Sequence, residues 1–302
     1  MKEPNGVLII NKHSGVTSHD IVNKVRRLYN TKKVGHTGTL DPMATGVLVV
    51  LVGRAAKAAE YLVCDEKSYR ATIKFGITTD TEDITGRIIT TSNDIPNAAA
   101  VEKACEDFVG KIEQIPPMYS ALKVGGRKLC DIAREGGIVE RAARKIEIFS
   151  LKCTPTERTS EYTLDVKCSS GTYIRTLCAD IGNRLGCGAV MSSLERTETG
   201  GFSIENAVKI ADIENMSVPE REALLIPTES LFSSLPRVVL SNFYERLCRS
   251  GCEIYLEKIK MSFEPSQKVS VCGADGAFFA LGEVREYSDG LAIKPIKFFD
   301  LS

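Results

Sequence analysis

Residues 35–46, GHTGTLDPMATG, most limit the fold of this chain, because they cannot build a helix or a central strand. Glycine adopts backbone conformations that other residues avoid, and proline lacks the amide donor that helices and ladders need. The pair Asp41-Pro42 favours the start of a turn. A continuous apolar run at residues 47–52 follows and predicts a buried strand. We therefore expect a loop that lifts the carboxylate of Asp41 and the imidazole of His36 into a cleft.

Asp41 is the candidate nucleophile of this loop, although an aspartate before a proline more often only caps a turn. A carboxylate acts as a nucleophile when it is kept ionised and aimed. Arg175 is the natural partner, because a guanidinium stays charged and can hold a carboxylate through two hydrogen bonds. The pairing would favour the charged form of Asp41 and fix its direction.

Three ring side chains could complete such a site. Tyr173 stands two residues before Arg175 in the sequence, and Tyr69 offers a flat face on a predicted strand. His36 could pack against a base or bond a phosphate. Each ring taken singly is more often a packing residue. Together with a nucleophile and an orienting cation, they form the stacking platform that an enzyme acting on an extruded base needs.

The composition is typical of a soluble globular protein, since 43% of the 302 residues are apolar and 26% are charged. The length predicts two domains, and a change of texture beyond Pro236 places them at residues 1–234 and 235–302. Ten cysteines without a C-x-x-C pair, and only three histidines, argue against a zinc site or a disulfide scaffold. We expect free thiols in a reducing cytoplasm, no metal site and no membrane span.

The chain has 39 basic and 39 acidic residues, but the basic residues gather in two segments. Residues 12–33 hold six lysines and arginines against one acidic residue, and residues 118–145 hold seven against three. The two segments could form one phosphate-binding face. They could equally be the solvated surfaces of separate helices, and the sequence does not decide between these interpretations.

The spacing of apolar residues predicts an α+β fold. Alternating or continuous apolar runs indicate strands at residues 7–10, 47–52, 67–75, 145–153, 161–169 and 189–199. Helical spacing and capping residues indicate helices at residues 18–29, 97–110 and 173–185. We expect residues 203–232 to be mostly helical, and the tail beyond Pro236 to consist of short strands and turns.

Several stretches, taken in order, closely resemble the signature of the TruB family of tRNA pseudouridine-55 synthases. The longest is GHTGTLDPMATGVL at residues 35–48. The others are KHSG (12–15), KSYR (67–70), TDTED (79–83), PPMYSA (116–121), SGTYIR (170–175) and LGCGA (185–189). An ordered set over residues 6 to about 200 is far more specific than a GHTG motif by itself.

The resemblance implies the mixed, largely antiparallel sheet of pseudouridine synthases, flanked by helices. It also implies a basic thumb insertion at about residues 119–145 and a small β-rich PUA-like module at residues 235–302. The implied activity is isomerisation of uridine 55 in the tRNA T-loop to pseudouridine, with the base flipped out. Uridine and pseudouridine are isomers, so the reaction requires no redox equivalent, phosphate donor or metal, and no cofactor is expected.

The resemblance also implies roles at the reacting centre. Asp41 would be the nucleophile and Arg175 its ionic partner. Tyr173 would lie beside the base as a contact or proton acceptor. Tyr69 would stack on the flipped uracil, and Leu194 would line its pocket.

Further residues would hold the loop and the RNA. His36 would support the disrupted T-loop, and Lys12 would support the active-site loop. The thumb would contact the RNA backbone through Lys123, Arg127, Lys128, Arg141 and Arg144.

The expected partner is the T-arm of tRNA, bound by a monomer in a bacterial cytoplasm. One alternative is a tRNA-binding folding chaperone that uses the same face without chemistry. A nucleotide-dependent enzyme ranks far behind, because neither a G-x-G-x-x-G nor a Gly-Lys-Ser/Thr motif follows a predicted strand. A guide-RNA-dependent synthase is the third alternative, and the compact chain with its own thumb favours the stand-alone type by analogy.

Overall fold

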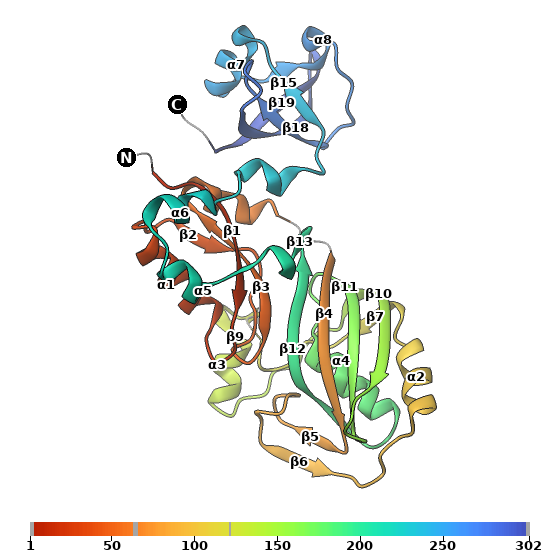
Figure 1. Cartoon of the computed structure of the whole chain (residues 1–302). Coiled ribbons are helices and arrows are strands. Elements are labelled where there is room, and N and C mark those ends of the chain that lie inside the picture. The colour runs from red at the N-terminus through yellow and green to blue at the C-terminus, as the bar shows by residue number, and fades with distance from the viewer. Residues whose placement is uncertain (1–2, 63–65, 121, 300–302) are drawn as a thin grey trace.

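The computed structural model describes residues 3–62, 66–120 and 122–299 and confirms the α+β fold (Figure 1). A ten-stranded mixed sheet with packed helices forms the larger body, and a five-stranded sheet lies at the C-terminal end. The larger sheet has the order β14 (Val208–Lys209), β1 (Gly6–Lys12), β3 (Thr45–Val52), β12 (Ala189–Thr199), β4 (Glu66–Phe75), β11 (Glu161–Ser169), β10 (Arg144–Pro155) and β7 (Gly110–Gln114). Off this path, β2 (Val34–His36) pairs with β3, and β13 (Phe202–Ser203) pairs with β12. Within the described ranges, no helix has the length and apolar character needed to cross a membrane.

Strands β1 and β3 pair antiparallel along their whole length, and both faces of this pair are buried. Leu48 and Val50 of β3 face the main core. Val47 and Val49 face a second apolar cluster on the other side. A strand buried on both faces has no polar alternation. This arrangement explains why residues 47–52 form an unbroken apolar run.

The other half of the sheet is buried on one face only. Ala71 and Ile73 of β4 pack into the main core, which also receives α4 (Ile174–Arg184) and α2 (Ala98–Glu106). Arg70, which precedes Ala71 in the strand, is exposed on the opposite face. This alternation is what a half-buried strand requires, and it confirms the predicted strand at residues 67–75.

The two halves of the sheet meet at a short parallel contact. Thr45 and Gly46 of β3 lie opposite Glu195 and Arg196 of β12. On their other edges, β3 pairs with β1 and β12 pairs with β4. The loop of residues 35–46 ends at this contact, so the fold presents the loop at the seam between the two halves.

Helix α1 (Ser18–Leu28) begins where the sequence predicted, after Thr17. The Thr17 side chain accepts a hydrogen bond from the Asp20 amide at 3.1 Å, and the Asp20 carboxylate accepts one from the Thr17 amide at 2.9 Å. This capping box satisfies two amide donors of the first turn. The first turn also carries Ser18, whose hydroxyl accepts a 2.9 Å hydrogen bond from the Leu40 amide and so ties the loop to α1.

Among its described residues, the thumb (residues 119–145) contains the short elements β8 (Lys123–Val124), β9 (Arg127–Lys128) and α3 (Leu129–Arg134), and its last two residues begin β10. Two backbone hydrogen bonds tie the start of α3 to the preceding chain. The Leu129 amide donates to the Leu122 carbonyl at 2.8 Å, and the Cys130 amide donates to the Ser120 carbonyl at 3.1 Å. In Figure 1, α3 and β9 lie below β3, at the seam of the sheet.

The C-terminal sheet has a core of its own, which includes Val269, Phe279 and Ile293 and is covered by α7 (Asn242–Arg249) and α8 (Leu256–Ile259). Its strands have the order β15 (Arg237–Val239), β17 (Lys268–Cys272), β18 (Phe278–Tyr287), β19 (Gly290–Phe298) and β16 (Ile254–Tyr255). This sheet contacts the larger body through the second apolar cluster, to which it contributes Leu281 and Phe299.

The expectation of a mostly helical segment at residues 203–232 is confirmed, but its helices are short. They are α5 (Ile210–Glu214), α6 (Val218–Ala223) and the 3-10 helices η2 (Ile204–Asn206) and η3 (Thr228–Phe232). Backbone pairing with a distant strand interrupts them. β14 runs parallel to β1, and Ile226 exchanges two backbone hydrogen bonds with Val7 at 2.8 and 2.9 Å.

Gly46 tests how strictly the seam fixes the loop. Its φ is +99°, and an added Cβ would lie 2.2 Å from the Arg196 carbonyl oxygen. We expect Gly46→Ala to lower the free energy of unfolding by about 3 kcal/mol or more, because left-handed strain and a backbone clash add together. Urea unfolding measures the loss. Gly110→Ala is the matched control, since Gly110 has a φ of +105° but open space around it. Equal losses in the two variants would contradict the steric argument.

Candidate active site

The active-site loop is held from one side by a buried lysine. Lys12, at the end of β1, is fully buried, and its ammonium donates hydrogen bonds to three backbone carbonyls. These belong to Val16 at 2.8 Å, His13 at 3.0 Å and Pro42 at 3.3 Å. Burial lowers the pKa of Lys12 to about 8, and the nearby charge of Asp41 opposes that shift. Lys12 therefore lies behind the loop and braces its backbone.

A buried arginine holds the loop from the other side. Arg196 on β12 is 1% exposed, and its Nε donates to the Val47 carbonyl at 2.8 Å. Its two terminal nitrogens donate to the Gly38 carbonyl at 3.0 Å and the Thr39 carbonyl at 3.4 Å. Sequence reasoning missed this residue. The available signal was its spacing, because Arg196 follows the buried Leu194 at the two-residue period of a strand.

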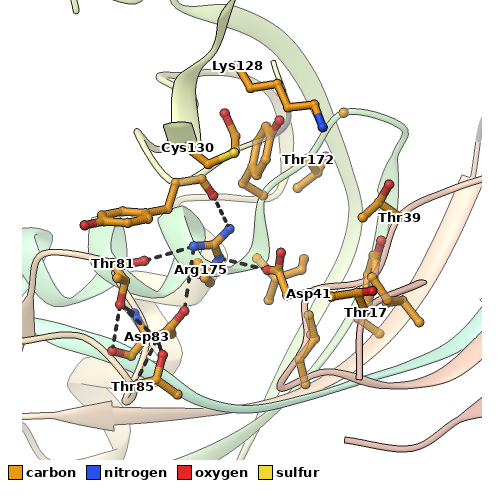
Figure 2. Close-up of a pocket in the computed structure, with 18 of the residues that line it drawn as sticks. Thr17, Thr39, Asp41, Thr81, Asp83, Thr85, Lys128, Cys130, Thr172 and Arg175 are labelled. Carbon is orange, nitrogen blue, oxygen red and sulfur yellow. Dashed lines mark hydrogen bonds and ion pairs between the residues drawn. The ribbon is translucent and has the colours of Figure 1, made fainter. Parts of the chain in front are cut away.

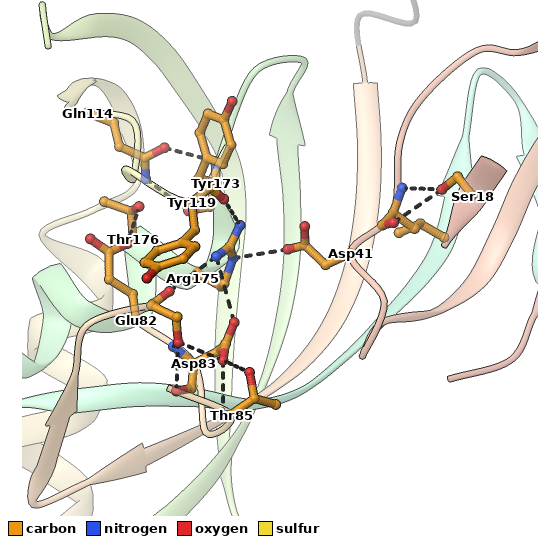
Figure 3. A network of polar contacts seen from close by, with 12 residues as sticks. Ser18, Asp41, Glu82, Asp83, Thr85, Gln114, Tyr119, Tyr173, Arg175 and Thr176 are labelled. Atoms are coloured by element: carbon orange, nitrogen blue, oxygen red, sulfur yellow. Dashed lines mark hydrogen bonds and ion pairs between the residues drawn. The ribbon is translucent and has the colours of Figure 1, made fainter. Parts of the chain in front are cut away.

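Asp41 meets Arg175 at this braced loop (Figure 3). The Arg175 Nε lies 3.0 Å from the Asp41 Oδ2. The other guanidinium nitrogens donate to the Thr81 carbonyl at 3.1 Å and the Tyr119 carbonyl at 2.8 Å. The Arg175 side chain is 6% exposed, whereas that of Asp41 is 36% exposed. The carboxylate is thus held on one side and open on the other.

Asp83 adds a second carboxylate that sequence reasoning did not place in the site. Its Oδ2 lies 3.7 Å from an Arg175 terminal nitrogen. Its Oδ1 accepts hydrogen bonds from the Thr81 hydroxyl at 2.8 Å, the Thr85 hydroxyl at 2.6 Å and the Thr85 amide at 2.9 Å. The turn of residues 81–85 therefore fixes Asp83, and Asp83 in turn helps to fix the direction of the guanidinium.

The charge of Asp41 is set by opposing effects. Burial raises the pKa of the Asp41 carboxyl above its ordinary value, and the Asp83 charge adds to that rise. The positive charges of Arg175 and Lys12 lower the same pKa and so limit the rise. Because desolvation disfavours the ionised form, the two cations are what oppose protonation of this carboxylate.

Asp41 lies in the wall of a cavity of about 650 Å³, a size that suits a nucleobase with its sugar (Figure 2). Of the predicted site residues, the cavity is lined by Asp41, Tyr69, Lys128, Tyr173, Arg175 and Leu194. Leu40 and Ile174 add further apolar atoms to the wall. The sequence thus predicted residues from five separate segments that the fold brings to one cavity.

Tyr69 and Tyr173 enter the cavity from different elements. Tyr69 lies on β4 on the same face as Ala71, and burial raises the pKa of its phenol above the ordinary value. Tyr173 precedes the first turn of α4. Its amide donates to the Gln114 Oε1 at 2.8 Å, and the Gln114 Nε2 donates back to its carbonyl at 3.1 Å (Figure 3). The amide of Gln114 therefore fixes the start of the helix that carries Arg175.

His36 does not share the cavity with Asp41, although the sequence predicted that one cleft would receive both side chains. It lies on β2, which pairs with Val50, Leu51 and Val52 of β3. Its Nδ1 is buried without a hydrogen-bond partner among the described residues. Burial lowers the pKa of His36, so the neutral imidazole is favoured.

The thumb contributes a polar wall to the cavity. Lys128 on β9 lines it, and Figure 2 shows this side chain reaching across the side opposite Asp41. Arg134 and Asp131 of α3 also line it, 3.5 Å apart, and sequence reasoning assigned neither of them. The other predicted thumb cations lie outside the cavity, and two of them have partners in the protein. Arg127 pairs with Glu135 at 2.6 Å.

Arg141 donates a 2.9 Å hydrogen bond to the Pro116 carbonyl, which ties the end of the thumb to its beginning. Lys123 and Arg144 are exposed on the thumb surface. These two side chains are therefore placed for solvent-side contacts, whereas Arg127 and Arg141 already take part in the internal structure of the thumb.

Solved structures show the same fold. A Cbf5-Nop10-Gar1 complex matches with a TM-score of 0.73 and 24% identity, covering 98% of this chain and 85% of that chain. The archaeal box H/ACA sRNP Nop10-Cbf5 complex matches with a TM-score of 0.71 and 22% identity, covering 99% and 87%.

Family models and curated relatives identify the class. The model described as TruB family pseudouridylate synthase (N terminal domain) matches residues 26–174. The model of the tRNA pseudouridylate synthase B C-terminal domain matches residues 175–233. The fold and these matches define a pseudouridylate synthase.

A protein of Alkaliphilus oremlandii named tRNA pseudouridine synthase B is 42% identical over 83% of each chain. One of the same name from Neisseria meningitidis serogroup B is 39% identical over 93% of this chain and 91% of its own. This chain belongs to the TruB family, and the resemblance seen in the sequence is confirmed.

The ion pair predicts how Asp41 titrates. We expect Arg175→Gln to raise the pKa of Asp41 further, because burial and Asp83 then act against fewer opposing charges. At a given pH the ionised fraction of Asp41 would fall. The carboxyl carbon shift of Asp41, followed by NMR through the acid range, measures this pKa. Arg184→Gln is the control, since Arg184 lies on the same helix but pairs with Asp107 at the surface. Identical midpoints in both variants and the parent would show that Arg175 does not control this charge.

Proposed function

We propose that this chain isomerises uridine 55 in the T-loop of tRNA to pseudouridine, with Asp41 as the nucleophile. The relatives named tRNA pseudouridine synthase B support a tRNA substrate. The observation that carries the assignment of the nucleophile is the geometry of its carboxylate. It lies 3.0 Å from the Nε of Arg175 and faces the cavity.

The reaction breaks the C1′–N1 bond, turns the uracil and forms a C1′–C5 bond. The hydrogen on C5 leaves as a proton, and N1 ends protonated. The Asp41 carboxylate can add to C1′, add to C6 of the base, or assist departure of uracil through a glycal. Each route uses an ionised carboxylate that is aimed at one nucleotide. Arg175 favours both the charge and the direction of the Asp41 carboxylate. Tyr173, beside the base, would accept the C5 proton or contact the ring.

Tyr69 and Leu194 supply the apolar wall on which the extruded uracil would lie. Extrusion from a folded loop costs a few kcal/mol. Stacking on an aromatic ring contributes roughly 1–3 kcal/mol per base and offsets that cost. The raised pKa of Tyr69 keeps its phenol neutral, so a negative charge does not arise beside Asp41.

Contacts outside the cavity would hold the rest of the tRNA. The thumb would bind the RNA backbone, and His36 would support the disrupted T-loop from the outer side of the loop. Lys12 would act indirectly by bracing the loop. Residues 235–302 would form a separate PUA-like module that touches the acceptor side. The chain would work as a monomer in the cytoplasm.

The Asp41→Asn variant tests the nucleophile, because it keeps the shape of the side chain and removes its charge. We expect pseudouridine formation to fall by about a thousandfold or more, with tRNA affinity within about twofold of the parent. The measurement is release of tritium from a tRNA transcript carrying C5-tritiated uridine. A transcript with cytidine at position 55 should release none.

Asp165→Asn serves as the matched control, since Asp165 is exposed on β11 and pairs with Arg70 at 2.8 Å. Its activity should equal that of the parent. If Asp41→Asn leaves the biological function intact, the chaperone alternative is favoured instead.

Salt dependence tests the thumb. We expect the triple variant Lys123→Gln, Lys128→Gln and Arg144→Gln to bind tRNA more weakly. Each lost phosphate contact should also reduce the slope of log affinity against log salt by about 0.7–0.9. Arg127 and Arg141 are left intact because they have partners in the protein. Filter binding over a range of salt concentrations gives both quantities.

The matched control changes three exposed lysines of α2, β7 and β10, namely Lys103→Gln, Lys111→Gln and Lys152→Gln. It removes the same charge from surfaces outside the cavity. Equal losses in the two triple variants would mean that net charge alone, rather than the thumb, attracts the tRNA.

A further inference from the structure

Ser120, in the PPMYSA segment, carries a buried hydroxyl without a partner. The residue is 5% exposed, and its Oγ makes no hydrogen bond to any described residue. A buried hydroxyl left unpaired costs about 1–3 kcal/mol. Such groups are rare in native structures and require an explanation.

The position of Ser120 joins the thumb to the reacting centre. Ser120 lines the same cavity as Asp41. The carbonyl just before it, that of Tyr119, accepts the 2.8 Å hydrogen bond of Arg175. Its own carbonyl accepts the 3.1 Å hydrogen bond of the Cys130 amide at the start of α3. Both neighbouring peptide groups are thus fixed, while the hydroxyl between them is buried and has no partner among the described residues.

The cavity is polarised from one wall to the other. Tyr69 and Leu194 make one wall apolar, whereas Ser120, Lys128 and the ion pair of Arg134 with Asp131 make the thumb wall polar. In Figure 2, the Lys128 side chain spans the thumb side, across the cavity from Asp41. A nucleotide with its base on the apolar wall and its C1′ at Asp41 must direct its sugar-phosphate toward the thumb wall. A phosphate oxygen only accepts hydrogen bonds, so it matches a hydroxyl donor beside an ammonium.

We propose that Ser120, together with Lys128, binds a phosphate flanking the extruded nucleotide and so sets the position of C1′ over Asp41. This assignment deepens the proposed function and rests on it. Ser120 is then a substrate-binding residue that reads the backbone of the target nucleotide. The thumb would then engage a phosphate next to the nucleotide whose base has been turned out.

The first test is Ser120→Ala. We expect kcat/KM for tRNA to fall at least about tenfold, as for loss of a hydrogen bond to a charged group. The thermal midpoint should stay the same or rise, because no hydrogen bond within the protein is lost. Thr228→Val is the matched control. Thr228 is also buried with an unpartnered hydroxyl, but it lies in the 3-10 helix η3 (Thr228–Phe232), outside the cavity. Parental activity in Ser120→Ala, or a lowered midpoint with lost activity, would overturn the proposal.

The second test identifies the group that Ser120 contacts. T-arm oligonucleotides carry a neutral methylphosphonate in place of the phosphate on either side of the target uridine. We expect one of these oligonucleotides to bind the parent protein about tenfold more weakly than the unmodified oligonucleotide does. The same replacement should weaken binding to the Ser120→Ala variant much less, because the contact is already lost there. Fully additive losses at both positions would refute the phosphate contact. Coupling to a 2′-deoxy substitution instead would assign Ser120 to the ribose.

Affinity is measured separately from catalysis, so the two proposals can fail independently. If the parent protein forms no pseudouridine in tRNA, the proposed function fails, and the coupling of Ser120 to the phosphate is still read from binding. If the parent is active and no coupling is found, the Ser120 assignment alone is refuted.

Discussion

The ion pair between Asp41 and Arg175 is the contact on which the site depends, because it joins the loop to a helix from far along the chain. Burying a guanidinium costs several kcal/mol unless its donors are satisfied. Here the acceptors are two carboxylates and two backbone carbonyls, those of Thr81 and Tyr119. The four acceptors come from three places: the loop, the turn of residues 81–85, which supplies two, and the base of the thumb. One side chain therefore fixes these segments relative to one another, and movement of any of them would leave a buried donor unpaired.

The same solution recurs behind the loop, where Lys12 and Arg196 are buried and donate to backbone carbonyls. An ammonium and a guanidinium thus replace the regular hydrogen bonds that a glycine- and proline-containing loop cannot make for itself. Their charges also matter, since that of Lys12 opposes the rise in the pKa of Asp41. Lys12 and Arg196 make the loop rigid, while Arg175 and Lys12 favour the ionised form of Asp41, so Lys12 serves both purposes. This linkage explains why a chain of balanced net charge concentrates buried positive charge at one point.

Much of the architecture could be predicted because it follows from local patterns. The run at residues 47–52 and the alternation at residues 67–75 each predict a strand, and a capping residue at Thr17 or Ser18 predicts the start of α1. Residues 203–232 are mostly helical, as predicted, but their helices are short because β14 and Ile226 pair with β1. The failures concern side chains whose surroundings exist only in the folded chain. Arg196 was missed because hydropathy places arginine outside, whereas the carbonyls that satisfy it exist only in the folded loop. His36 was placed in the cavity because sequence proximity to Asp41 does not reveal which way a short edge strand turns a side chain.

The two walls of the cavity differ in how firmly they are held, and that difference suits its proposed substrate. Asp41, Arg175 and Tyr69 come from the braced loop, the first turn of α4 and a central strand, which are the parts of a fold that open least. The thumb wall comes from two-residue strands and a short helix that are largely exposed. A base and its C1′ must meet a fixed carboxylate, so precision is needed on the first wall. The sugar-phosphate backbone of a folded RNA needs room to enter the cavity. A thumb wall with few internal contacts can move to give it that room. Ser120 lies where the rigid wall ends and the thumb begins. From this place its unpaired hydroxyl would connect phosphate binding to the position of the reacting carbon.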